Sequence, residues 1–371
     1  MIKKFLQQIF KVVSYFIFFK IYGKIKKPLE EERDNKIKIE ISNIDKDLSY
    51  KIYKITDGRL YTDRIHDTAI INDNRIIEGP SFQLRYTSEG KIYNSNINEN
   101  IVFKKGTPRI LKKLNGTTLS LLTGGGGNYN YWHWLFDVLP RLALCSKNIN
   151  LQKIDYFLFP SLLKKFQNET LDLLNVPQNK RISSEKFRHI KAKELIVTDH
   201  PVLTSGNATE DITNIPIWII QWLKNNFIKK NITNNIKIKK KIYIDRSTTN
   251  SKDLEPRRIS NEEEVKNYLL KNDFILVKLH EIGFNEQVDL FHNADCIVGL
   301  NGAGFGNLVF CESNVKVIEF RPSNEGGAIK NLAQKNNLNY HSLIIQNQFP
   351  NQQGSIHVSI NSLTKILESQ K

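Results

Sequence analysis

A histidine and a carboxylate stand four residues apart in Leu121 to Leu142, a stretch that reads LLTGGGGNYNYWHWLFDVLPRL. We expect a helix to begin near Tyr131, so His133 and Asp137 would share one helical face. Such a pair suits general-base catalysis, in which one group takes a proton and the other orients it or tunes its pKa. The alternative is a structural pair near a helix end. The glycines and aromatic residues around the pair favour a site.

Four glycines, Gly124 to Gly127, precede this helix and oppose regular structure there. They predict a flexible loop or a loop that covers a ligand. The helix should run towards Lys147, with Pro140 at a kink or boundary, because proline lacks the N–H that a helix interior needs. Trp134 and Val138 lie on the neighbouring face, where they can pack into the core.

A second stretch, Asp295 to Arg321, reads DCIVGLNGAGFGNLVFCESNVKVIEFR and predicts a strand, a glycine turn, a short helix and a strand. The turn Asn301-Gly302-Ala303-Gly304 lets backbone approach a ligand closely. Backbone N–H groups at the following helix start favour a phosphate. Glu319, at the end of the second strand, is placed to accept hydrogen bonds from a ribose. The alternative is a tight turn that binds no ligand.

The elements that must position these residues alternate along the chain. After the first helix we expect strands over 154–159 and 194–198, with helices over 160–174 and 216–227. A strand over 241–244 leads into Arg246, whose guanidinium can form two parallel hydrogen bonds with a phosphate. Strand–helix alternation predicts βαβ units and parallel sheets. Short strands and turns between residues 52 and 101 predict a β-rich entry to the first of these α/β domains.

We divide the chain into three parts on composition. Residues 1–38 form a basic amphipathic segment, residues 39–230 an N-terminal domain, and residues 231–371 a C-terminal domain. The polar, basic run KKNITNNIKIKKK between residues 229 and 241 is the expected linker. A chain of 371 residues is long enough for two domains of ordinary size.

The overall charge points to an acidic partner, because the formal net charge is +16. Much of the lysine is scattered among Ile and Asn, so this charge carries little weight by itself. Three cysteines without a CxxC spacing argue against a disulfide framework or a zinc site, and they fit a reducing compartment. The segment Asp45-Lys46-Asp47 has an acid-x-acid spacing, but it lies in a polar loop and we expect no metal there.

The first 27 residues, MIKKFLQQIFKVVSYFIFFKIYGKIKK, combine apolar residues at helical spacing with lysines. The longest uncharged apolar stretch, Val12 to Phe19, is too short to span a bilayer, which needs about 20 residues. No small-residue cleavage site follows, which disfavours a signal peptide. Either the helix lies on an anionic membrane surface, or it packs on the domain. The sequence leaves both readings open.

Four blocks of the sequence together resemble those of one known family. They are NYWHWLFDVLPRL, then YIDRS with RRISNEEEV, then FNEQVDLFHNADCIVGLNGAGFGNLVF, then VIEF. Their order and spacing between about Asn130 and Phe320 resemble glycosyltransferase family 61, including its bacterial capsule and surface-polysaccharide members. The family's turn usually reads His-Gly-Ala, whereas this chain has Asn301-Gly302-Ala303. Asparagine can still donate a hydrogen bond but carries no positive charge.

The resemblance implies a GT-B fold, which is an α/β fold of two Rossmann-like domains with parallel sheets facing a cleft. It also implies an inverting enzyme without a metal or other cofactor. The donor would be a nucleotide-sugar, expected to be UDP-linked, and the acceptor a glycan or lipid-linked saccharide in surface-polysaccharide synthesis. The basic N-terminal segment looks more like a bacterial peripheral enzyme, so a cytoplasmic place at the inner membrane face is expected. The donor would be held by residues of the second half, namely Arg246, Arg258, Asn301, Gly302, Ala303, Gly304 and Glu319.

In the mechanism that we expect, Asp137, oriented by or acting with His133, removes the proton from an acceptor hydroxyl. Two other classes stay open. A Rossmann-type NAD(P) oxidoreductase would share the strand, glycine turn and acid, but Asn307 stands where the third glycine of GxGxxG belongs. A non-catalytic basic protein that binds RNA or lipid would explain the charge, yet no RNA-binding aromatic strand and no groove-reading basic helix is visible, so we expect no nucleic-acid partner.

Overall fold

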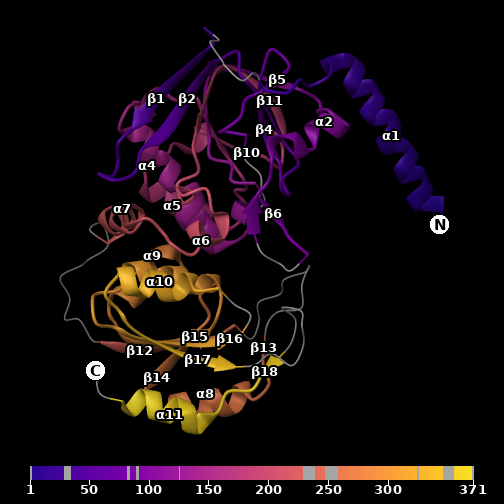
Figure 1. Ribbon diagram of the computed structural model, residues 1–371. Coiled ribbons are helices and arrows are strands. Elements are labelled where there is room, and N and C mark those ends of the chain that lie inside the picture. Colours follow the sequence, from indigo (N-terminus) through magenta and orange to yellow (C-terminus); the bar gives the residue numbers. More distant parts are fainter. Residues whose placement is uncertain are drawn as a thin grey trace. The chain divides into compact units, whose positions relative to one another are not determined.

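A computed structural model describes residues 2–28, 35–81, 84–88, 92–124, 126–228, 239–246, 258–323, 326–345 and 355–369. The chain divides into two compact units, residues 1–212 and 213–371. Each unit is described by itself below. Both combine helices with a large sheet (Figure 1).

The first unit is built on a mixed sheet with the order β10-β9-β8-β11-β3-β4-β5, to which β2 adds by pairing with β11, and β1 by pairing with β2. The neighbours β10, β9, β8 and β11 are parallel, and the pairs that involve β1 to β5 are antiparallel. The strands of this sheet are β1 (Ile37–Ser42), β2 (Tyr50–Thr56), β3 (Arg59–Thr62), β4 (Thr68–Asn72), β5 (Arg75–Ile76), β8 (Lys112–Ser120), β9 (Tyr156–Phe159), β10 (Arg181–Ser183) and β11 (His189–Thr198).

The sequence prediction of a parallel sheet in this unit is therefore wrong in part. The predicted βαβ alternation accounts for the parallel strands β8 to β11 only. The β-rich entry adds β1 to β5, which pair antiparallel with one another or with β11. The two-residue turn between β4 and β5 can only reverse the chain, which gives an antiparallel pair. Asp73 and Asn74, between β4 and β5, have φ angles of 43° and 58°, the left-handed geometry that such hairpin turns require.

The remaining elements of the first unit lie around this sheet. A short hairpin pairs β6 with β7. The helix that was predicted from Tyr131 is three consecutive segments, α3, a π-helix and α4, separated by single residues at most. The bounds are α1 (Ile2–Tyr22), β6 (Leu84–Tyr86), β7 (Ile92–Asn94), α2 (Val102–Lys105), α3 (Tyr131–His133), the π-helix (Trp134–Val138), α4 (Pro140–Ser146), α5 (Lys165–Leu173) and α6 (Ala208–Asp211).

The second unit contains an all-parallel sheet with the order β14-β12-β15-β16-β17. Numbered along the chain within this sheet, the order is 2-1-3-4-5, which is the doubly wound arrangement that binds ligands at its switch point. A separate pair joins β13 to β18. The strands are β12 (Lys240–Ile244), β13 (Arg258–Ile259), β14 (Phe274–Val277), β15 (Ala294–Leu300), β16 (Lys316–Pro322), β17 (Asn339–Ile345) and β18 (Ser355–Ile356).

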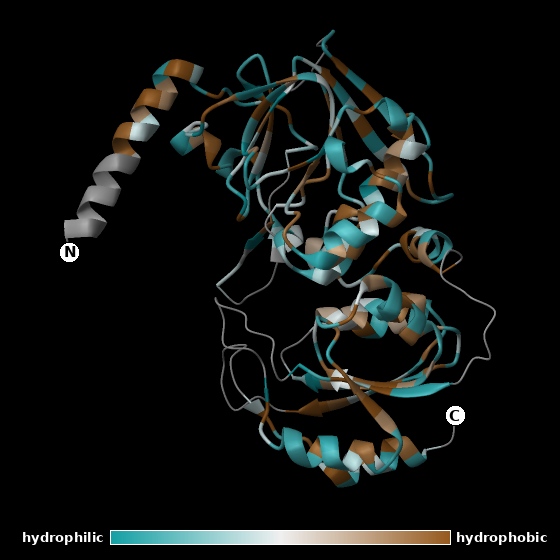
Figure 2. Ribbon diagram, turned by 180° about the vertical axis from the view of Figure 1, so that it is seen from behind, coloured by the Kyte–Doolittle hydropathy of each residue, from teal (hydrophilic) through white to brown (hydrophobic). Residues whose placement is uncertain are grey.

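Helices cover both faces of the second sheet (Figure 1). On one face, Val265 and Leu269 of α8 and Leu363 of α11 join a buried cluster with Val298 and Ile318 of the central strands. On the other face lie α9 and α10, and hydrophobic colour runs along the strands between the two helix layers (Figure 2). The bounds are α7 (Ile217–Phe227), α8 (Glu262–Leu270), α9 (Phe284–His292), the 3-10 helix η6 (Ala303–Phe310), α10 (Ala328–Lys335) and α11 (Ile360–Glu368).

The predicted strand, glycine turn, short helix and strand over 295–321 is confirmed as β15, η6 and β16. Both strands are buried on both faces, as their continuous apolar runs predict. The expected linker falls largely on residues 229–238, outside the described residues, so the three-part division of the chain stays a prediction. The GT-B arrangement of two facing halves also stays a prediction.

Candidate active site

The helix that carries His133 and Asp137 begins with a side-chain cap and widens before Pro140. The Asn130 side chain accepts hydrogen bonds from the backbone N–H groups of Trp132 and His133, at 2.9 and 3.4 Å. The backbone N–H of Leu139 donates to the carbonyl of Trp134, five residues earlier, at 3.1 Å. Since proline has no N–H, the wide turn ends where an α-helical ladder would lose a donor. Such π turns recur at functional sites.

The π-helical part of this segment is anchored in the core through Trp134. The indole N–H of Trp134 donates to the Thr170 hydroxyl of α5 at 2.9 Å, and both residues are fully buried. The Trp134 ring also packs on Phe159 of β9 and Phe166 of α5. A buried donor that is satisfied in this way resists displacement, because breaking the bond leaves an unpaired polar group in the core. The segment therefore holds the neighbouring His133 on a rigid support.

The predicted contact between the imidazole and the carboxylate is present. Nδ1 of His133 lies 2.6 Å from Oδ2 of Asp137. The His133 side chain is 38% exposed, whereas that of Asp137 is 12% exposed. Burial lowers the pKa of His133, but the charge and hydrogen bond of Asp137 outweigh burial and the net pKa is raised. Burial raises the pKa of Asp137, and His133 outweighs this effect, so the net pKa is lowered. Asp137 is thus a buried carboxylate that supports a more accessible imidazole.

The glycine-rich loop lies directly against this imidazole. A Cβ on Gly126 would stand 3.0 Å from two carbon atoms of the His133 ring. A Cβ on Gly127 would stand 2.6 Å from the Val138 side chain, and Gly124 has a φ of +73°, which residues with a side chain rarely adopt. Small residues are therefore required here by close packing over the helix. The loop forms one wall around His133.

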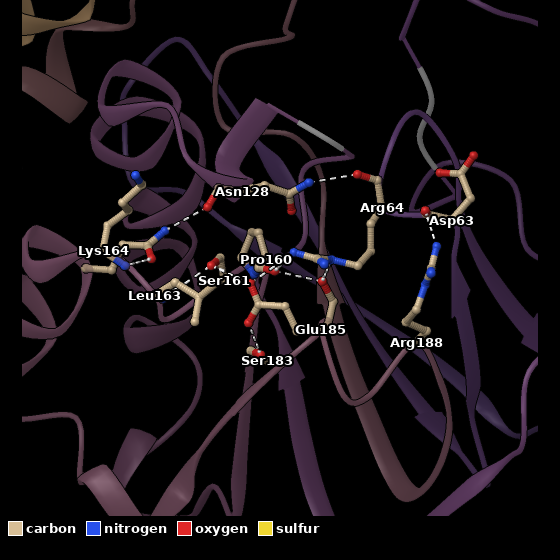
Figure 3. A network of polar contacts seen from close by, with 12 residues as sticks. Asp63, Arg64, Asn128, Pro160, Ser161, Leu163, Lys164, Ser183, Glu185 and Arg188 are labelled. Atoms are coloured by element: carbon tan, nitrogen blue, oxygen red, sulfur yellow. Dashed lines mark hydrogen bonds and ion pairs between the residues drawn. The ribbon is translucent and has the colours of Figure 1, made fainter. Parts of the chain in front are cut away.

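A polar network holds the loop in this position (Figure 3). The Asn128 side chain donates to the carbonyl of Arg64 at 2.7 Å, and the Gln167 side chain donates to the carbonyl of Asn128 at 3.1 Å. The Arg64 guanidinium forms an ion pair with Glu185 at 3.1 Å. Glu185 in turn accepts hydrogen bonds from the Ser161 and Ser183 hydroxyls at 2.6 and 2.5 Å. The loop is thereby tied to the carboxyl ends of β9 and β10.

Two residues at the end of β11 and on α4 complete the site, and the sequence analysis missed both. Arg141 is buried and donates to the carbonyls of Asp137, Thr198 and Asp199. Burial lowers its pKa to about 10, so it remains a cation at neutral pH. Nε2 of His200 lies 4.0 Å from Oδ2 of Asp137. The signal for His200 was weak, since it is one polar residue after an expected strand, whereas Arg141 stands four residues after Asp137 in the expected helix.

The tautomer of His200 follows from its backbone contacts. Its Nδ1 accepts hydrogen bonds from the N–H groups of Val202 and Leu203, at 3.2 and 3.3 Å. Burial lowers the pKa of His200 to about 3, although Asp137 acts in the opposite direction. His200 is therefore neutral at physiological pH, with its proton on Nε2, the atom nearest to Asp137. His200 presents its N–H dipole to the carboxylate, and His133 is the imidazole next to Asp137 that can carry a positive charge.

A cavity of about 340 Å³ opens beside His200. This volume lies within the range of small-molecule sites. Most of the side chains around it carry hydroxyl, amide, carboxyl or imidazole groups. Its lining includes residues just before β2 and just after β11, two strands that pair antiparallel, so the cavity lies at the carboxyl end of β11 on the side of β2. The lining residues include Asp47, Ser49, Tyr50, Asn94, Asp199 and His200.

In the second unit, the predicted donor residues Arg246 and Asn301 meet. Arg246 follows β12 and Asn301 follows β15, the two strands between which the order reverses. The Arg246 guanidinium donates to the Asn301 carbonyl at 2.5 Å. A Cβ on Gly302 would stand 2.7 Å from the same guanidinium, so the glycine allows this close approach. Ala303 and Gly304 begin η6 beside it. A cation and a helix start therefore share the ligand-binding edge of the sheet.

Glu319 is held inside the protein. It is 1% exposed, and its two carboxylate oxygens accept hydrogen bonds from the Asn301 amide and the Tyr340 hydroxyl, each at 2.5 Å. In this arrangement Glu319 orients Asn301, and its role as a ribose ligand stays a prediction. Arg258 begins β13, which pairs with β18 in the separate two-stranded sheet, and its role at the donor stays a prediction. Within the ranges the structure describes, no cluster of three or more His, Cys, Asp or Glu residues could hold a metal ion.

Comparison with known proteins identifies the chain. The family model described as Glycosyltransferase 61 matches residues 131–318, about half of the chain, a range that includes His133, Asp137, Arg246 and Asn301. The EGF domain-specific O-linked N-acetylglucosamine transferase of Canis lupus familiaris is 30% identical over 115 residues. That match covers 29% of this chain and 22% of the relative, so the chain spans about a fifth of the length of this curated relative. The protein belongs to glycosyltransferase family 61 and is an enzyme that transfers sugars.

Proposed function

We propose that this enzyme transfers a sugar from a UDP-linked donor to a saccharide hydroxyl, with inversion at the sugar carbon and without a metal ion. The observation that carries the proposal is the dyad of a half-exposed His133 on a buried Asp137, at 2.6 Å. An inverting transfer needs one base that takes the acceptor proton while the hydroxyl oxygen attacks the sugar carbon and the nucleoside diphosphate leaves. The dyad supplies such a base.

The two members of the dyad take different roles. Nδ1 of His133 is engaged by Asp137, so Nε2 is the nitrogen that takes the acceptor proton. Asp137 fixes the tautomer and orientation of the ring and stabilises the imidazolium that forms. This assignment reverses the expectation that Asp137 itself is the base, because Asp137 is the more buried group and His133 the more accessible one.

In this proposal the sugar donor binds at the switch point of the second sheet. The departing diphosphate develops negative charge, and fixed cations and N–H groups that face this charge lower the barrier. Arg246 is held beside the start of η6 by its bond to Asn301. In this proposal Arg246 and the turn Asn301 to Gly304 bind the diphosphate, and Glu319 keeps Asn301 in place.

In this proposal the saccharide acceptor binds in the cavity beside His200. Hydroxyl, amide and carboxylate groups are the partners that sugar hydroxyls need, and the cavity offers them from Ser49, Asn94 and Asp199. We assign this cavity to the part of the saccharide acceptor next to the reacting hydroxyl. Surface-polysaccharide synthesis is the pathway that we propose for the product.

The first test is thermal unfolding of the purified protein with a panel of nucleotides and nucleotide-sugars, with and without EDTA. A ligand that binds only the folded state raises apparent stability by about 2.7 kcal/mol at a hundredfold excess over Kd. We expect UDP or a UDP-sugar to raise the unfolding temperature equally with and without EDTA. A shift with another nucleotide would replace UDP in the proposal, and a shift that EDTA removes would contradict metal independence.

The acceptor cavity is tested separately. Ser49→Trp fills the cavity, whereas Lys46→Trp places the same side chain on the same exposed loop outside the cavity lining. We expect Ser49→Trp to raise the acceptor KM at least about tenfold, because a filled pocket loses its ligand contacts, and to leave the nucleotide-induced thermal shift unchanged. Equal acceptor KM values for the two variants would show that the acceptor binds elsewhere.

A further inference from the structure

The N-terminal helix α1 has two distinct faces. Tyr22 attaches one face to the first unit: its hydroxyl accepts a hydrogen bond from the Leu111 N–H at 2.9 Å, and its ring meets His189 edge-on. Phe18 stacks on Tyr22. The other face, between residues 12 and 21, leaves large apolar side chains exposed. They are Val12, Val13, Phe16, Ile17, Phe19 and Ile21, which are 41–66% exposed.

The helix is fixed to the unit at its carboxyl end. Gly23 ends it with a φ of +75°, and the Gly23 N–H donates to the Phe19 carbonyl at 2.9 Å. Ile25 is buried in a cluster with residues of β3, β4 and β5. The Lys26 N–H and carbonyl bond the strand end at Asn74 and Ile76. A folded attachment therefore holds the helix that carries the exposed face. Hydrophobic bands alternate with paler and hydrophilic ones along this part of α1 (Figure 2).

Charge decides which partner fits this face. Residues 1–28 contain seven lysines and no acidic residue. Lys20 lies one helical turn after Phe16, on the same apolar face, with its ammonium group 4.7 Å from the Phe16 ring centroid. Lys24 and Lys27 are exposed beside the helix end. A protein interface would bury the Lys20 ammonium, which is costly without an acidic partner. At a membrane surface, the lysine stem can lie on apolar groups while the ammonium reaches lipid phosphates.

We propose that α1 binds the surface of an anionic membrane through its exposed apolar face and its lysines. None of the described helices is long and apolar enough to cross a membrane. A helix of this kind lies in the plane of the interface, with apolar side chains among the acyl chains and cations at the headgroups. This site is separate from the donor and acceptor sites, so the proposal does not depend on the proposed reaction.

Sedimentation of the full-length protein with vesicles tests the proposal. We expect the protein to bind vesicles that mix phosphatidylcholine with phosphatidylglycerol, and to bind phosphatidylcholine alone far more weakly. Phe16→Ser should weaken binding on the order of tenfold, and Lys20→Glu by at least about fivefold. Rising salt should weaken binding of the wild type, because exposed charges are screened.

Two matched variants control for general loss of apolar surface or charge. Leu270→Ser removes an exposed apolar side chain from α8, and Lys113→Glu reverses an exposed charge on β8. Both should bind as the wild type does, and because Phe16 is exposed, Phe16→Ser should keep the wild-type unfolding temperature. Equal binding to neutral and anionic vesicles, or no effect of Phe16→Ser, would overturn the proposal. A dimer in light scattering that Phe16→Ser dissociates would instead assign the face to a second copy of the chain.

Discussion

Nδ1 of His133 and Oδ2 of Asp137 lie 2.6 Å apart, within one helical segment whose turn is widened before Pro140. The contact joins a half-exposed imidazole to a buried carboxylate. His200, just after β11, lies 4.0 Å from that carboxylate, and Arg141 of α4 donates to the backbone carbonyl of Asp137. The pair is therefore built into the core on one side and accessible on the other. This asymmetry gives each member a separate role that substitutions can distinguish.

Replacing Asp137 by Asn tests the dyad. The isosteric amide keeps the shape but cannot stabilise the imidazolium, so kcat should fall by about 10²–10⁴. The thermal shift with the donor nucleotide should remain, because the donor residues lie in the other unit. Glu169→Gln, an amide substitution on α5 in the same unit, is the control and should keep full kcat. Unchanged kcat in Asp137→Asn would exclude the dyad as the base.

The pH dependence of kcat/KM follows from the raised pKa of His133. The base must be deprotonated to act, so the rate is lost as pH falls through the pKa of His133. In the wild type this acidic limb should lie above pH 6.5, because Asp137 raises the pKa above its ordinary value. In Asp137→Asn only burial remains, which lowers the pKa, so the limb of the residual activity should move below pH 6.5. An acidic limb that stays in place in the variant would argue that another group titrates.

The donor site is tested by Arg246 and Gly302. Arg246→Gln removes a fixed cation beside the glycine turn, and kcat/KM for the donor should fall by about 10²-fold. Gly302→Ala places a Cβ 2.7 Å from the Arg246 guanidinium and should cause a smaller loss by displacing it. Lys239→Gln removes a cation just before the opposite end of β12 and should leave donor kinetics unchanged. If all three variants bind the donor equally well, the diphosphate does not occupy the switch point.

His200 links stability to pH. Its pKa is lowered to about 3 in the folded protein, whereas an unfolded histidine titrates near 6.5. Between these values the unfolded chain binds the proton first, so folding stability is full above pH 6.5 and decreases as pH falls towards 3. His200→Asn keeps a side-chain acceptor but removes the titration, so urea unfolding should show a shallower loss between pH 6.5 and 4. His189, whose pKa is lowered to about 4 by burial, should maintain part of the slope.

Local patterns were enough to predict much of this protein. The four-residue spacing of His133 and Asp137 determines that they meet on a helix, and the apolar runs around Asn301 determine two buried strands. These features depend on residues close in sequence, whose geometry is fixed by the helix and strand repeats. The four blocks of family-like sequence also led correctly to a glycosyltransferase of family 61.

Only the tertiary structure decided which distant residues meet these features. His200 reaches Asp137, and Thr198 reaches Arg141, across some 60 residues, through the pairing of β11 with β8. The period of a strand reports which face is buried but not which strand lies beside it, so His200 could not be assigned from sequence. Arg141 stands four residues after Asp137, but its contacts with Thr198 and Asp199 depend on the same strand pairing. The sequence marked Glu319, at a strand end, as a candidate ribose ligand, and that role stays a prediction. Tyr340 of the next strand and Asn301 occupy its two oxygens, and hydrogen-bond partners of a buried carboxylate are determined by packing.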